Sequence, residues 1–140
     1  MMADHAHLRR LQRLEKLRGI ARHNALAEAG RAETRLASLE MLQARTNALI
    51  TGYAARTDAQ CGADLARQRI YLGELQGMVG RNDSDVARAR DQADARAAEA
   101  AAAERSRAAV ETRANATAQA IARARSAAAL PLGARNTRKP

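Results

Sequence analysis

The chain has 140 residues and a formal net charge of +9, and 46% of its residues are hydrophobic but only 1% are aromatic. With no Trp or Phe and with 37 alanines, it lacks the bulky side chains that fill a thick globular core. Its only prolines are Pro131 and Pro140, so long helices are permitted almost throughout.

The first predicted element is a helix over residues 5–57. Its apolar residues follow a heptad-like frame, although five of fourteen frame positions are polar. Near its start, leucines and an isoleucine recur every three residues, so this apolar line winds around the helix and a single partner helix cannot cover all of it. The members of this winding line are Leu8, Leu11, Leu14, Leu17 and Ile20. The polar frame positions are Glu15, Arg18, Arg22, Gln43 and Thr46.

A turn is predicted over residues 58–64. Residues 57–62 lose the apolar period and collect turn-favouring residues, and Asp64 is placed to cap the helix that follows. A turn centred near residue 61 or 62 sets Tyr53 opposite Tyr71. The glycines within residues 73–80 offer a competing position for a kink or a turn.

The second predicted helix spans residues 65–130 and has the clearest coiled-coil seam. Steps of seven from Leu65 meet an apolar residue at nine of ten positions, the exception being Arg107. A companion series three residues later mixes apolar residues such as Leu75 with polar ones such as Asn82. Together the two helices predict an all-α fold, a long antiparallel two-helix coiled-coil hairpin. The ten positions spaced by seven residues are Leu65, Leu72, Val79, Val86, Ala93, Ala100, Arg107, Ala114, Ile121 and Ala128.

Residues 131–140 form a predicted basic tail, because Pro131 and Gly133 are expected to end the second helix. The charge of the chain is concentrated near its two termini. Residues 1–24 carry six Arg or Lys against two acids, residues 101–140 carry eight against two, and residues 25–100 carry ten against eleven. An antiparallel hairpin brings the two basic segments together, so one end is predicted to be strongly cationic and the other nearly neutral.

No group of residues predicts catalysis. His5 and His7 form the only histidine cluster and have no third ligand nearby, and the single cysteine, Cys61, excludes a cysteine-based zinc cluster. The chain has no glycine-rich phosphate loop and no nucleophile beside a base. We therefore expect no enzyme activity, no metal, no cofactor and no small-molecule substrate. Without a signal peptide or a run of about 18 apolar residues, the chain is expected to be cytoplasmic.

Two short segments carry a resemblance to a known family. Residues 69–78, Arg-Ile-Tyr-Leu-Gly-Glu-Leu-Gln-Gly-Met, are similar to the aromatic-x-x-x-Leu segment that opens the second helix of the flagellar export protein FliJ family. Leu36, Leu39 and Leu42 are similar to the Leu-rich end of that family's first helix. The helix lengths, the turn and the basic tail extend the resemblance over nearly the whole chain. The sequence departs from the family in its fewer aromatics, its additional alanines and its glycine cluster.

This resemblance implies a non-enzymatic stalk of the flagellar type III export apparatus, cytoplasmic and peripheral at the cytoplasmic face of the inner membrane. Its implied partners are the hexameric export ATPase, which it stimulates, the cytoplasmic domain of the export gate protein, and export chaperones. The implied gate contacts are Leu39, Leu42, Tyr71, Leu75 and Met78. The implied ATPase contacts are Arg9, Arg10, Leu11, Arg13, Leu14, Leu17, Arg123 and Arg125.

Two other interpretations fit the same sequence. Clustered arginines also bind phosphate backbones, so a basic coiled coil associated with nucleic acid is an alternative. The lack of aromatic stacking groups and of a bZIP-like basic helix argues against it, and nucleic acid is not the expected partner. An injectisome stalk homologue would have the same architecture with other partners.

Overall fold

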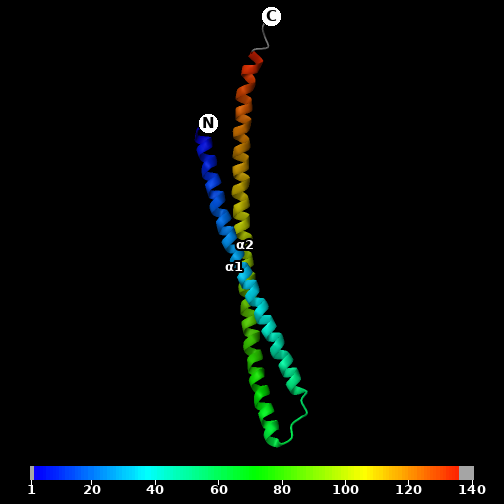
Figure 1. Cartoon of the computed structure of the whole chain (residues 1–140). Helices are drawn as coiled ribbons and strands as arrows, with labels where there is room; N and C mark the ends of the chain where they lie inside the picture. Colours follow the sequence, from blue (N-terminus) through cyan, green and yellow to red (C-terminus); the bar gives the residue numbers. More distant parts are fainter. Residues whose placement is uncertain (1, 136–140) are drawn as a thin grey trace. The chain divides into compact units, whose positions relative to one another are not determined.

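The computed structural model describes residues 2–135, which form an all-α two-helix hairpin (Figure 1). Helix α1 spans Met2–Ala54 and helix α2 spans Gly62–Arg135, with a loop over residues 55–61 between them. The predicted all-α helix pair is therefore confirmed. Over the described residues, neither helix contains a stretch apolar enough to cross a membrane.

The turn lies a few residues earlier than the predicted range of 58–64. The amide of Leu65 donates to the Cys61 carbonyl at 3.2 Å, so α2 has already begun before Asp64. Asp64 therefore does not cap the helix but lies in its first turn, where its carboxylate favours the positive end of the helix dipole. The competing turn among the glycines of residues 73–80 does not form, because α2 continues through them.

Helix α2 also continues through Pro131 to Arg135, so the prediction that Pro131 and Gly133 end it is wrong. A proline inside a helix removes one backbone hydrogen bond and costs about 3 kcal/mol. The alanines at 127–129 and at 134 have a high helix propensity, which favours the helical backbone on both sides of Pro131. The predicted basic tail thus begins inside α2, and residues 136–140 lie outside the described residues.

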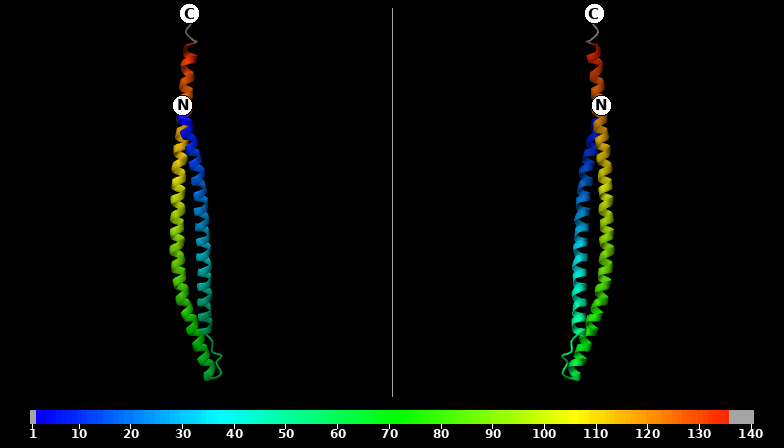
Figure 2. Two further views of the ribbon diagram at one scale, coloured as in Figure 1. Left: turned by 90° about the vertical axis from the view of Figure 1, so that its left-hand side faces the viewer. Right: turned by 90° about the vertical axis from the view of Figure 1, so that its right-hand side faces the viewer.

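The chain divides into two compact units. Unit 1 comprises Met1–Ala25 and Glu99–Pro140, and unit 2 comprises Leu26–Ala98. Within each unit, a segment of α1 and a segment of α2 run side by side in opposite directions (Figure 2). Unit 1 therefore contains both basic segments of the sequence, and unit 2 contains the loop and both tyrosines.

The buried apolar residues of α2 all belong to the two predicted heptad series. In unit 2 they are Leu75, Val86, Ala89 and Ala93, and in unit 1 they are Ala100, Val110 and Ala114. The predicted seam is confirmed over this stretch. It opens at both ends, since Leu65 is 49% exposed and every residue from 122 to 130 is exposed.

Candidate protein-binding surfaces

The side of α1 that faces away from α2 in unit 1 combines apolar and cationic side chains. Successive members of the three-residue series turn by about 60° around the helix. The series therefore lies in the seam at Leu11, 8% exposed, and has left it at Leu17, 63% exposed, and at Ile20, 59% exposed. This confirms the predicted winding of the apolar line. We call the exposed residues of this segment the basic apolar surface: Arg9, Arg10, Arg13, Leu14, Lys16, Leu17 and Ile20.

Leu11 does not belong to this surface, although it is among the implied ATPase contacts. At 8% exposure it packs in the seam of unit 1 and contributes to the stability of the helix pair. The sequence pattern could not separate Leu11 from Leu14, because the position of the partner helix decides which member of a winding series is covered.

The end of α2 adds further positive charge to unit 1. Arg123 and Arg125 are exposed, and one guanidinium nitrogen of Arg125 lies 3.2 Å from Nε2 of His5. Beyond them α2 continues past the start of α1 (Figure 2), and Leu130 is 72% exposed. Unit 1 thus presents an uncovered stretch of α2 in addition to the basic apolar surface.

In unit 1, the two acids of residues 101–140, Glu104 and Glu111, form ion pairs with Arg107. The Arg107 guanidinium donates to Glu104 at 2.8 and 3.0 Å and to Glu111 at 2.8 Å. Glu104 also pairs with Arg22 across the seam. Hydrogen bonding from Arg107 lowers the pKa of Glu104, and the two carboxylates raise the pKa of Arg107. Glu104 and Glu111 are the only acids of residues 101–140, which carry eight Arg or Lys, so this segment keeps a clear excess of positive charge.

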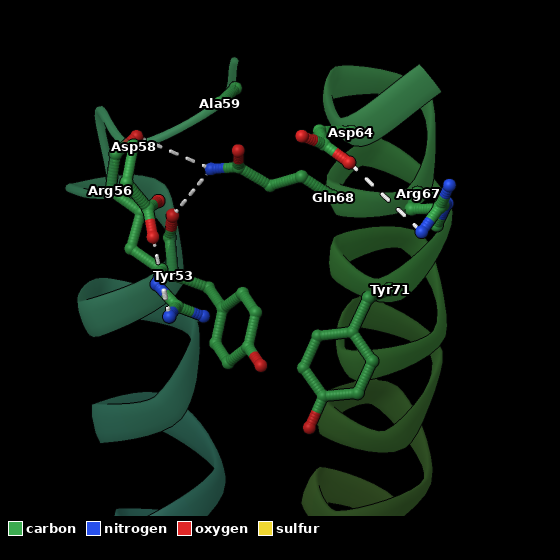
Figure 3. Close-up of a pocket in the computed structure, with 8 residues that line it drawn as sticks. All are labelled: Tyr53, Arg56, Asp58, Ala59, Asp64, Arg67, Gln68 and Tyr71. Carbon is green, nitrogen blue, oxygen red and sulfur yellow. Dashed lines mark hydrogen bonds and ion pairs between the residues drawn. The ribbon is translucent and has the colours of Figure 1, made fainter. Parts of the chain in front are cut away.

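The tyrosines meet beside the loop in unit 2. The rings of Tyr53 and Tyr71 face each other between the helices (Figure 3), with centroids 4.4 Å apart and an interplanar angle of 46°. This confirms the predicted pairing. The Arg56 guanidinium lies 5.0 Å from the Tyr53 ring centroid, and Gln68 donates to the Tyr53 carbonyl at 2.8 Å. These residues line an open pocket of about 300 Å³ between the loop and the adjoining ends of the two helices.

The implied gate contacts divide between surface and core. Leu42, Tyr71 and Met78 are 43%, 37% and 38% exposed, and Leu39 is half-buried. Leu75 is only 3% exposed, so it is buried in the seam and is not part of an exposed surface. It lies on the companion heptad series, which faces α1. We call Leu42, Tyr71 and Met78 the tip surface.

Several exposed large apolar residues of unit 2 belong to no predicted surface, and Leu49 and Ile70 are two of them. Leu49 is 48% exposed and Ile70 is 65% exposed. Both lie outside the seam positions. A large apolar residue outside the heptad frame is expected to be exposed, and this pattern could have identified them from the sequence.

Within residues 2–135, no three His, Cys, Asp or Glu side chains gather closely enough to hold a metal ion. The basic apolar surface and the tip surface each gather exposed apolar side chains, which favour binding of another macromolecule. No family model, curated protein or solved structure matches this chain.

Proposed function

We propose that this chain is a non-enzymatic coiled-coil adaptor that binds a protein partner through the basic apolar surface of unit 1. The observation that carries the proposal is the exposure of Leu14, Leu17 and Ile20 among arginines on one side of α1. Contiguous apolar side chains rimmed by charge are typical of protein–protein interfaces, where arginine is also enriched.

The mixture of leucine and arginine favours a protein partner over a nucleic acid. A phosphate backbone attracts the cations but gains nothing from Leu17 or Ile20. A partner with an apolar, acid-rimmed surface engages both kinds of side chain at once, and the complementary charge also speeds the encounter.

The partner that we propose is the hexameric export ATPase of a flagellar type III export apparatus. The support is the family resemblance together with the charge of unit 1, which suits a central pore lined by several copies of one loop. In this proposal the chain stimulates ATP hydrolysis without catalysing it, and works at the cytoplasmic face of the inner membrane.

We assign the tip surface of unit 2 to a second partner, the cytoplasmic domain of the export gate protein. Tyrosine and methionine are enriched at interfaces, and Tyr71 and Met78 are both partly exposed. Export chaperones are further candidate partners from the same resemblance.

The test is a binding titration against the purified hexameric export ATPase. Leu14→Ala with Leu17→Ala is expected to weaken binding at least tenfold, since interface anchors contribute about 1 kcal/mol or more each. The matched control is Leu26→Ala with Met41→Ala, which removes side chains of similar exposure, 46% and 59%, from unit 2. This control is expected to bind like the parent chain.

A second titration uses duplex DNA at about 0.15 M salt. If the parent chain binds DNA tightly, the leucine substitutions leave that affinity unchanged, and the ATPase is not bound at all, then the nucleic-acid alternative replaces the adaptor proposal.

A further inference from the structure

A buried polar pair crosses the seam of unit 2. The Asn82 side-chain amide donates to the Thr46 hydroxyl at 3.0 Å, and that hydroxyl donates to the Leu42 carbonyl at 2.9 Å. Thr46 is 2% exposed and Asn82 is 7% exposed, and they are the only buried polar residues among residues 2–130. Beside them, the Gln43 amide donates to the Asp83 carboxylate at 2.6 Å. Thr46 interrupts the apolar frame of α1 and Asn82 interrupts the companion series of α2, so these two polar interruptions meet each other.

The apolar seam alone does not fix how α1 and α2 are aligned. Its members repeat every seven residues, so a slip of one heptad again sets apolar residues against apolar residues. Such a slip moves one helix by about 10.5 Å along the other. The loop over residues 55–61 can follow, because an extended chain spans about 3.3 Å per residue. Small alanine side chains make the alternative alignments similar in packing.

The polar pair distinguishes these alignments. After a slip of one heptad, Asn82 faces Leu39 or Tyr53, which lie seven residues before and after Thr46. Its side-chain amide is then buried without the hydroxyl that satisfies it here. Thr46 likewise faces an apolar residue of α2. A slip removes the acceptor of the buried Asn82 amide, whereas the Thr46 hydroxyl keeps its bond to the Leu42 carbonyl within α1. Since a buried polar group without a hydrogen-bond partner is strongly unfavourable, the Asn82 amide favours the observed alignment.

We infer that Thr46 and Asn82 form a register lock that holds the two helices of unit 2 in one alignment. The lock is a specificity device, because a polar pair within an apolar seam selects one register without adding apolar burial. It also keeps the exposed residues of the tip surface at fixed positions relative to one another, since Leu42 lies on α1 while Tyr71 and Met78 lie on α2.

The test measures the alignment directly in the full chain. Spin labels are attached at Ser38→Cys and Gly73→Cys in a Cys61→Ser background, at exposed positions on the two helices of unit 2. A Cβ at position 73 meets no atom within 4 Å, so this label does not disturb the seam. Pulsed electron paramagnetic resonance is expected to give one narrow distance for this parent. With Thr46→Val and Asn82→Leu added, a second distance is expected, displaced by about 10 Å, or a change in oligomeric state by light scattering.

Two further variants make the result decisive. Thr34→Val with Asn47→Leu applies similar changes to exposed positions of α1 and is expected to keep the single distance. The exchange Thr46→Asn with Asn82→Thr keeps a polar pair across the seam and is expected to keep the single distance too. One unchanged distance and an unchanged oligomeric state in the Thr46→Val, Asn82→Leu chain would overturn the inference. A second distance in the exchange variant would also overturn it.

Discussion

The substitution Leu75→Ala is expected to lower the free energy of unfolding by about 2–3 kcal/mol. Leu75 is 3% exposed, so nearly all of its side chain is removed from water on folding. The change to alanine deletes three carbons, and each buried carbon contributes about 0.8 kcal/mol. The cavity adds to this loss, but a seam of two helices closes more easily than a thick core, which sets the estimate near the lower end for such substitutions.

The matched comparison is Met78→Ala, three residues along the same helix. Met78 is 38% exposed, so a loss of only about 1–1.5 kcal/mol is expected. Urea titrations of both full-length variants, followed by far-UV circular dichroism, measure the difference. Equal losses, or a loss below about 1 kcal/mol for Leu75→Ala, would refute the placement of Leu75 in the core and restore it as a surface residue available to a partner.

Three further predictions follow from individual contacts. Because Arg107 lowers the pKa of Glu104 below its ordinary 4.5, the interaction stabilises the fold above that pH and is lost as the pH falls through the lowered pKa. Thermal melts should therefore show a smaller loss of stability on acidification in Glu104→Gln than in the parent, and equal losses would contradict this. Gly73→Ala and Gly80→Ala should each raise the free energy of unfolding by about 1 kcal/mol in urea titrations, since a Cβ at either position meets no atom within 4 Å. Asn82→Ala should lower it by about 1–3 kcal/mol, because the substitution removes the buried partner of the Thr46 hydroxyl; an unchanged midpoint would count against the buried pair.

The heptad pattern was sufficient to predict the fold class and much of the seam. Val86, Ala93, Ala100 and Ala114 are buried where steps of seven from Leu65 place them. Periodicity identifies the face that a helix buries, because it depends on the local geometry of that helix alone.

What periodicity could not predict is which residues meet across the seam. Thr46 and Asn82 each interrupt the apolar heptad pattern of their own helix. In the fold, however, the Asn82 amide donates a hydrogen bond to the Thr46 hydroxyl. Likewise, Arg22 and Glu104 form a pair only once the two helices are aligned. Partner choice depends on long-range register, which a single helix does not encode.

The sequence predicted the kinds of residue that form the candidate surfaces, but not which of them are exposed. Leu17 is exposed where the winding apolar line turns away from the seam, whereas Leu11 and Leu75 are buried in the core. The difference lies in the position of the second helix, which covers one side of each series. The end of α2 shows the same limit, since Pro131 alone does not stop a helix that alanines favour on both sides.

The most direct test of the adaptor proposal is the rate of ATP hydrolysis by the hexameric export ATPase, measured with and without this chain. We expect the parent chain to raise the rate, Leu14→Ala with Leu17→Ala to reduce the stimulation, and Leu26→Ala with Met41→Ala to retain it. A hydrolysis rate that the parent chain leaves unchanged at saturating concentration would contradict the proposal.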